Sequence, residues 1–335
     1  MSQEGGAVQT LSPVMKLRYL AEAALFFAFM GLFQLLGVDR ASALGGFIGR
    51  QILARTHVTR RARDNLVAAF PEKDTGEVDA IIEEMWDNLG RTVAEYPHLD
   101  KFRVTGANPR IEVVGLDRVD RVLASGKGII FLSGHFANWE IMPITAADYG
   151  VKGGTVYRPV NNPYVDRWMV RQRTENGPAE VVSKGAQGTR RIFTLLRGGK
   201  SIFILVDQKT NEGIPANFFG RMAMTTPAPA VLGLKIGAVL LPVTNERMGG
   251  ARFRVTVHEP ITPVATGDHD RDVLTVTQEI NDVLEAVIRR RPSQWLWIHR
   301  RWPKTGDRVR SRRGRDTQDL GGSGVAVESE GSSLS

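Results

Sequence analysis

Cysteine is absent from the 335-residue chain, which excludes disulfides, thiolate metal sites, iron–sulfur clusters and a cysteine nucleophile. The sequence also lacks a glycine-rich G-x-G-x-x-G or Walker-type loop after an apolar run, so a nucleotide site has no support. Neither a metal site nor a cofactor is expected. The remaining composition, 42% apolar and 24% charged, is typical of a globular chain.

Acidic side chains are fewer than basic ones, 36 against 44, which gives a formal net charge of +8. Such an excess favours an anionic partner, and the candidates are a membrane surface, a nucleic acid or a phosphorylated substrate.

Long apolar runs are also scarce, and the clearest one covers residues 23–38, AALFFAFMGLFQLLGV, without a charge. A bilayer core needs about 20 apolar residues. The run therefore predicts a marginal single span or a helix embedded from one side, with a buried core helix as the alternative. A cleaved signal peptide is disfavoured because no small-residue cleavage site follows. Basic residues follow the run more densely than they precede it, which predicts a cytoplasmic location for the rest of the chain: Arg40, Arg50, Arg55, Arg60, Arg61 and Arg63 after it, Lys16 and Arg18 before it.

Periodicity predicts helices before residue 105 and an α/β region after it. Residues 77–96 place apolar side chains at helical spacing. From residue 111 onward, short β-rich runs alternate with helical patterns, which predicts an α/β fold with a mixed, mostly parallel central sheet flanked by helices. Residues 128–133 and 201–207 are almost continuously apolar and should be central strands. The expected organisation is an N-terminal membrane anchor (1–40), a basic and amphipathic helical region (41–105), an α/β domain (106–303) and a disordered tail (304–335).

One of the six histidines, His135, stands at the end of a predicted central strand, and Glu140 follows five residues later across a strand-to-helix turn. Ligands bind at the carboxyl ends of strands in open α/β sheets. An imidazole held there by a carboxylate can act as a general base. No serine lies between the two residues, which favours direct proton removal from a substrate hydroxyl over an acyl-enzyme. The alternative is a structural histidine.

The block H-F-A-N-W-E at residues 135–140 resembles the H-x4-[D/E] signature of glycerolipid acyltransferases. Its form is similar to the H-F-x-N-W-E of the late lipid A acyltransferases, the lauroyl and myristoyl transferase type. Five further blocks agree in order: VYRPVNNPYVD from Val156, R-Q-R at Arg171 to Arg173, LRGGKSIFILVDQ from Leu196, FFGRMAMTT from Phe218 and PSQWLWIHRRW from Pro292. The tail after Trp302 is not part of this resemblance.

The resemblance implies a glycerolipid-acyltransferase-like fold in which His135 is the general base and Glu140 orients it. The implied donor is a thioester on acyl carrier protein, and the implied acceptor is a hydroxyl of a lipid A precursor. The implied substrate-binding positions are Arg173, with Arg171 as its near alternative, Arg158, Asp207 and Gln208. An arginine suits a phosphate or an oxyanion, and Asp207 can hold that arginine. For Arg158 and Arg171 the alternative is a solvated face, and for Asp207 a strand-end cap.

Two further segments have weaker interpretations. Thr225 or Thr226 with Phe218 and Phe219 form a glycine-flanked loop that could line an acyl groove. The tryptophans of the C-terminal block alternate with arginines in a manner suited to a membrane interface, with core positions for two of the three tryptophans as the alternative: Trp295, Trp297 and Trp302 with Arg300 and Arg301. Nucleic-acid binding through this patch is rejected, because it would give the apolar run no role.

We therefore expect an inner-membrane acyltransferase of lipid A biosynthesis, with its catalytic domain on the cytoplasmic face and an anionic membrane, acyl carrier protein and a lipid A precursor as partners. One alternative is an acyltransferase that uses acyl-CoA and acts on a mannosylated phosphoinositide. The other is a non-catalytic basic membrane-binding module in which His135 and Glu140 are structural.

Overall fold

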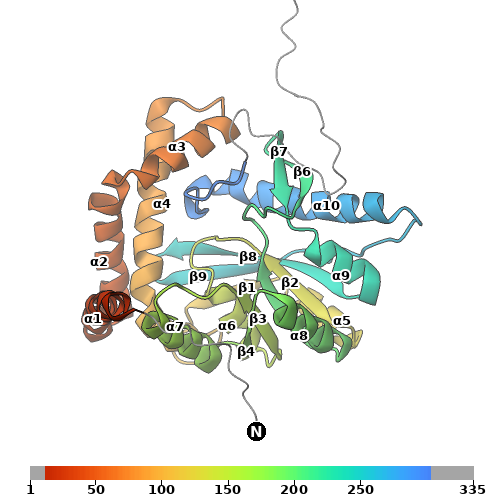
Figure 1. Ribbon diagram of the computed structural model, residues 1–335, viewed down its shortest axis with the longest axis horizontal. Helices are drawn as coiled ribbons and strands as arrows, with labels where there is room; N and C mark the ends of the chain where they lie inside the picture. The colour runs from red at the N-terminus through yellow and green to blue at the C-terminus, as the bar shows by residue number, and fades with distance from the viewer. Residues whose placement is uncertain (1–11, 303–335) are drawn as a thin grey trace, which may run out of the picture. The chain divides into compact units, whose positions relative to one another are not determined.

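The computed structural model describes residues 12–302, and its centre is a seven-stranded sheet in the order β1-β9-β8-β2-β5-β3-β4 (Figure 1). A separate two-stranded sheet pairs β6 with β7. The strands are β1 (Ile111–Val114), β2 (Ile129–Ser133), β3 (Gly153–Tyr157), β4 (Ala179–Ser183), β5 (Ser201–Leu205), β6 (Ile214–Phe218), β7 (Arg221–Thr225), β8 (Val239–Gly249) and β9 (Arg252–Val257).

Helices precede, separate and follow these strands. They are α1 (Pro13–Leu36), α2 (Val38–Gln51), α3 (Val58–Ala69), α4 (Thr75–Glu95), α5 (Leu116–Ala124), α6 (Ile141–Asp148), α7 (Pro163–Asn176), α8 (Ala186–Arg197), α9 (Ala228–Ile236) and α10 (His269–Arg290), with short 3₁₀ turns η1 (Leu53–Arg55), η2 (Tyr96–Lys101) and η3 (Pro292–Gln294). Local sequence explains where α4 begins, because Asp74 and Glu77 form a capping box at its start.

In the large sheet, all neighbouring strands are parallel except β8 and β9. The predicted mixed, mostly parallel sheet is therefore confirmed. The two almost continuously apolar runs form β2 and β5, which pair with each other near the middle of the sheet, as expected.

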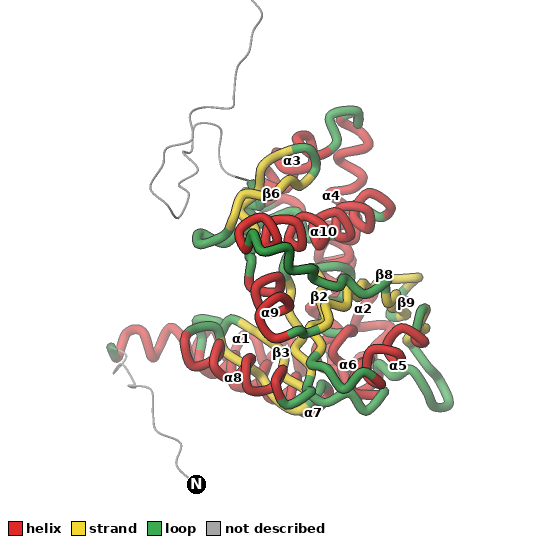
Figure 2. The backbone as a smooth tube through the Cα atoms, turned by 90° about the vertical axis from the view of Figure 1, so that its right-hand side faces the viewer, coloured by secondary structure: helices red, strands yellow, loops and turns green. Residues whose placement is uncertain are grey.

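Both faces of the sheet are covered, which explains why its central strands are apolar throughout. Along β2, Ile130 and Leu132 join the apolar cluster that contains residues of α9 and α10. Their neighbours Ile129 and Phe131 face the other cluster, with residues of α5 and α6. Figures 1 and 2 accordingly show α10 on one side of the sheet and α6 and α7 on the other.

Helices α2 and α4 run side by side at unusually close range (Figure 1). A Cβ added at Gly90 would lie 2.0 Å from the carbonyl oxygen of Gly45, and one at Gly49 would lie 2.0 Å from that of Trp86. Only glycine lets the two backbones approach this closely. The contact fixes the position of α4, which in turn holds the loop after β2.

Helix α1 corresponds to the predicted membrane run and packs against the rest of the chain on one side only. It contacts α2, α7 and η2 and buries Ala23, Met30 and Phe33. Within residues 12–302 it is the one helix long and apolar enough to cross a membrane, and 17% of its most apolar window is buried. A fully buried core helix is therefore excluded. Its other side exposes apolar residues: Leu17, Leu20, Leu25, Phe27, Phe29, Leu32 and Leu35.

Two sequence interpretations are corrected here. The segment 214–225 is a β-hairpin, and Phe218, Phe219 and Thr225 are buried in it instead of lining a groove. The tryptophans of the C-terminal block, together with Arg301, are also buried, at 0–5% exposure, so they do not form a membrane-facing or nucleic-acid-binding patch: Trp295, Trp297 and Trp302. The predicted tail, 304–335, lies outside the described residues.

Candidate active site

The site lies where the two central strands end. The register pairs Ser133 of β2 with Leu205 of β5, so residues two positions further along, His135 and Asp207, lie side by side. The Val206 N–H donates to the Ser133 carbonyl and continues the ladder between them. Parallel neighbours end at the same edge of the sheet, which is where α/β proteins bind ligands.

Asp207 holds His135 with both of its carboxylate oxygens. Oδ1 lies 2.8 Å from the ring Nδ1, and Oδ2 accepts the backbone N–H of His135 at 2.7 Å. The indole N–H of Trp295 also donates to Oδ2, at 2.8 Å. Gly134 is required here, because a Cβ at this position would lie 3.1 Å from the Asp207 carboxylate and 2.8 Å from the ring of Phe136.

This environment keeps Asp207 ionised although its side chain is only 2% exposed. Burial would raise the pKa of Asp207, but the neighbouring imidazole, its hydrogen bonds and the Trp295 indole outweigh burial and hold that pKa well below its usual range. An ionised carboxylate only accepts hydrogen bonds. Nδ1 of His135 therefore carries a proton, so the neutral ring has its lone pair on Nε2, which is the tautomer a general base needs.

Gln208 follows directly and lies against the face of the ring. Its amide nitrogen Nε2 is 3.1 Å from Nε2 and 3.5 Å from Nδ1 of His135, and 3.0 Å from Nε2 of His299. The structure thus brings His135, Asp207 and Gln208 together, as adjacent positions at one strand edge allow. His299 was not singled out from the sequence, because it follows no predicted strand.

Glu140 belongs to a second, buried cluster. The Arg173 guanidinium donates to both of its carboxylate oxygens, from Nη2 at 2.6 Å and from Nε at 3.0 Å. The Tyr96 hydroxyl donates to Glu140 Oε1 and accepts from Arg173 Nη2 at 3.0 Å. Burial would raise the pKa of Glu140, but the Arg173 charge and these hydrogen bonds outweigh it and lower that pKa. The pair is a bidentate, desolvated ion pair.

The prediction that Glu140 orients His135 is therefore corrected. The ring of His135 is held by Asp207 at Nδ1, and the Gln208 amide lies against it. The prediction that Asp207 holds the arginine is corrected for the same reason, because Glu140 holds Arg173. The two carboxylates have exchanged the expected partners, because strand register places Asp207 beside the imidazole, whereas Glu140 lies in the buried cluster with Tyr96 and Arg173.

The loop between His135 and Glu140 is held by α4. Ala137 has a positive φ of 44°, which a non-glycine residue adopts only when its surroundings enforce it. Its carbonyl accepts hydrogen bonds from Asn88 and Thr92 of α4, both at 3.0 Å, and its N–H donates to the Gln294 carbonyl at 2.8 Å. Asn138 accepts the N–H of Glu140 at 3.1 Å and donates to Glu95 at 2.9 Å.

Comparison with known protein families identifies the family of this chain. Residues 12–304 match the family described as bacterial lipid A biosynthesis acyltransferase. The chain belongs to this family. It is an acyltransferase of the late lipid A type, as the sequence blocks implied.

Several characterised relatives are similar to this family member. The lipid A biosynthesis palmitoleoyltransferase of Escherichia coli is 27% identical and covers 76% of this chain and 84% of its own length, and the lauroyltransferase of the same organism is 26% identical over 80% and 87%. The phosphatidylinositol mannoside acyltransferase of Mycobacterium tuberculosis is 23% identical over 76% and 80%. The solved 1-acyl-sn-glycerophosphate acyltransferase of Thermotoga maritima aligns with 76% of this chain and 98% of its own, at 12% identity and a TM-score of 0.35.

In this acyltransferase, the two remaining candidate arginines do not join the site. Arg158 is exposed after β3. The Arg171 side chain is 65% exposed on α7 and lies 3.7 Å from Glu175, one helical turn away. Arg173 is the arginine of the R-Q-R that faces inward. The solvated-face alternative thus describes Arg158 and Arg171.

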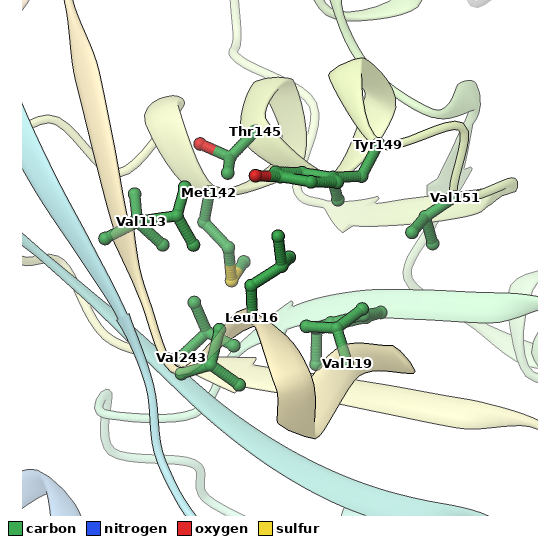
Figure 3. A pocket seen from close by; sticks show the side chains of 12 residues that line it. Val113, Leu116, Val119, Met142, Thr145, Tyr149, Val151 and Val243 are labelled. Atoms are coloured by element: carbon green, nitrogen blue, oxygen red, sulfur yellow. The ribbon is translucent and has the colours of Figure 1, made fainter. Parts of the chain in front are cut away.

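An apolar pocket lies elsewhere in the acyltransferase, between α5, α6 and the strands β1, β2, β8 and β9 (Figure 3). Leu116, Met142 and Val243 point into it, and Thr145 and Tyr149 are the polar side chains at its wall. None of its lining residues belongs to the His135–Asp207–Gln208 cluster. Among the described residues, no group of His, Asp or Glu side chains is arranged to hold a metal ion.

Proposed function

We propose that the protein transfers a fatty acyl chain from a thioester of acyl carrier protein to a hydroxyl of a lipid A precursor. The observation that carries this proposal is the His135–Asp207 pair, in which an ionised, buried carboxylate fixes the imidazole with its lone pair on Nε2. Family membership supports the reaction class and the lipid A pathway. The donor and the roles of individual residues are our inference.

The reaction needs one proton acceptor and no covalent enzyme intermediate. Nε2 of His135 takes the proton of the acceptor hydroxyl while the hydroxyl oxygen bonds to the thioester carbonyl carbon, whose electron pair moves to its oxygen. When the carbonyl forms again, the carbon–sulfur bond breaks, and the leaving sulfur takes the proton from the imidazolium. Asp207 stabilises the imidazolium and keeps the ring oriented, as a carboxylate does in other histidine-based sites.

Glu140 and Arg173 support this centre indirectly. Two nitrogens of the Arg173 guanidinium are bound to Glu140 and Tyr96, so we assign the arginine to holding α7 against the loop after β2. Glu140 precedes α6 directly and ends the segment that begins at His135. The ion pair therefore fixes the loop that presents the base, and any contact of Arg173 with a lipid phosphate is secondary to this role.

We place the protein at the inner membrane, with the catalytic residues on the cytoplasmic face. The support is α1, which exposes one apolar side while the other contacts the catalytic part along its length. The Tyr19 carbonyl accepts from Asn162, Phe26 packs on Trp168 at 5.4 Å, and the Phe33 carbonyl lies 2.9 Å from the His98 ring. A helix bound along the protein surface in this way favours embedding from one side over a span.

Basic residues after α1 contribute only in part to membrane attraction. Arg50 and Arg63 pair with Asp87 and Asp79. Arg40, Arg55 and Arg60 are exposed and are the candidates for contact with anionic headgroups.

Mass spectrometry of total lipids from cells with and without the gene tests the proposal. We expect a lipid A species that is lighter by one acyl chain when the gene is missing. A change confined to mannosylated phosphoinositides would support the alternative acceptor, and unchanged lipids would support the non-catalytic module. Parallel assays of the purified protein with acyl carrier protein and coenzyme A thioesters decide the donor.

A further inference from the structure

A second imidazole, His299, lies beside His135. The centroids of the two rings are 5.5 Å apart, and the amide nitrogen of Gln208 lies between them, 3.1 Å from Nε2 of His135 and 3.0 Å from Nε2 of His299. A single side-chain amide thus bridges the expected base and a histidine to which the resemblance assigns no role.

The contact between Gln208 and His299 has one pattern of protons. A primary amide nitrogen carries two hydrogens and does not accept. Nε2 of His299 therefore accepts one of them, which it can do only as a neutral ring. Burial, with smaller contributions from His135 and Arg61, lowers the pKa of His299 to about 4 and keeps the ring neutral at ordinary pH.

The backbone around His299 is firmly held. The Asn65 side chain on α3 donates to the carbonyls of Trp297 and His299, both at 2.7 Å. Arg61 donates to the carbonyl of Ile298 at 3.2 Å. His299 is therefore a fixed acceptor, whereas Gln208 is a longer side chain that can move about it.

We propose that His299 is a positioning residue that holds Gln208 with its amide N–H directed at the reaction centre, where Gln208 donates to the carbonyl oxygen that becomes negative during acyl transfer. This inference rests on the proposed function. The amide lies against the ring of His135, close to both ring nitrogens, and leaves the lone-pair direction of Nε2 to the acceptor hydroxyl. One amide N–H is bound to His299. This bond keeps the second N–H within reach of the thioester oxygen. Donors placed in this way stabilise the transition state more than the ground state.

Substitution of His299 tests whether the acceptor atom matters. His299→Phe keeps an aromatic ring but removes the acceptor, and His299→Gln supplies an acceptor oxygen. In steady-state transfer by the full-length protein, we expect His299→Phe to lower kcat about ten-fold with little change in KM, and His299→Gln to recover most of it. Gln208→Ala should lower kcat about 10²-fold or more. Because His299 acts through Gln208, His299→Phe should cause little further loss in the Gln208→Ala background. Losses in kcat that multiply in the double variant, or an effect of His299→Phe on KM alone, would overturn the proposal.

A control histidine and a measurement without substrate separate this inference from the proposed function. His258 is also partly buried, with its pKa lowered to about 4, but it bonds Thr244 and belongs to another part of the fold. In ¹⁵N-histidine NMR of the full-length protein at fixed pH, the Nε2 resonance of His135 should move in Gln208→Ala and in His299→Phe but not in His258→Phe. A resonance unaffected by His299→Phe would contradict the arrangement. A wild-type protein that transfers no acyl chain would overturn the proposed function, while the NMR result would still judge the role of His299.

Discussion

At the residue scale, the two carboxylates of the site differ in what they hold. Asp207 contacts the imidazole that reacts, and Glu140 neutralises a buried guanidinium. Replacing a carboxylate that orients a base should lower the rate of transfer. Replacing one that compensates a buried charge should lower the stability of the fold, because the partner charge is then left buried and uncompensated.

The first prediction concerns Glu140→Gln. Removing the Glu140 carboxylate leaves the Arg173 charge buried without a counter-ion, and we expect a loss of about 3 to 5 kcal/mol in the free energy of unfolding. Denaturant unfolding of the purified protein measures it. Glu180→Gln is the matched control, because Glu180 forms a surface pair with Arg191 and should cost no more than about 1 kcal/mol. Equal losses in both variants would contradict the assignment.

Sequence reasoning identified both carboxylates but not their partners. His135 and Glu140 share one motif, and proximity in the chain suggested that they interact. The partner of His135 is instead 72 residues away. His135 and Asp207 stand at the ends of the two predicted central strands, so an assumption that β2 and β5 are neighbours would have indicated the pair. That pairing is a property of sheet order, which local patterns do not encode. His299 and Tyr96 were missed because tertiary packing alone brings them to the site.

At the scale of elements, the segments with a clear pattern were predicted well: the helical spacing of residues 77–96 became α4, and the two apolar runs became β2 and β5. The hairpin β6–β7 was missed, because its turn at Phe219 and Gly220, both at positive φ, follows no common two-residue signature. The tryptophans near the C-terminus were misassigned because alternation with arginine looks amphipathic in sequence, while the fold buries Arg301 with them.

The second prediction concerns the contact between α2 and α4. Gly90→Ala would force its Cβ against the backbone of Gly45, and neither backbone can yield without separating the helices. We expect a destabilisation of about 2 kcal/mol or more, measured by thermal or denaturant unfolding. Gly31→Ala is the control within a helix, since nothing lies within 4 Å of its added Cβ, and it should be neutral or slightly stabilising. A tolerated Gly90→Ala would show that the helices do not depend on this approach.

The third prediction concerns the exposed face of α1. Leu25→Glu with Phe29→Glu places charges on exposed apolar positions, so the fold should survive while membrane binding weakens. Sedimentation with vesicles that contain anionic lipid should show the variant released to the supernatant. Leu274→Glu on α10, another exposed apolar position, should remain bound like the wild type. Unchanged binding of the α1 variant would mean that other surfaces attach the protein.

At the scale of the whole molecule, stability should depend on pH through two partly buried, neutral histidines. Burial, with smaller contributions from nearby positive charges, lowers the pKa values of His258 and His299 to about 4, against about 6.5 in an unfolded chain. The unfolded chain therefore binds more protons between these values, and acid favours unfolding.

The fourth prediction follows from this difference. Stability is fully present above pH 6.5 and should fall as the pH is lowered towards 4, by up to about 3 kcal/mol for each histidine. Unfolding midpoints measured across this range test it. His258→Phe removes one of the two titrating groups and should flatten the dependence. A midpoint that is constant from pH 7 to 4 would contradict the neutral state of both rings.

The central claim is that Asp207, and not Glu140, orients the base that accepts the proton during acyl transfer. Its most direct test is the initial rate at which purified Asp207→Asn transfers an acyl chain from acyl carrier protein to a lipid A precursor, relative to the wild type. An asparagine keeps the shape but favours the wrong tautomer of His135, and we expect the rate to fall by about 10²- to 10⁴-fold while the protein remains folded. Near-wild-type transfer by Asp207→Asn would contradict the account.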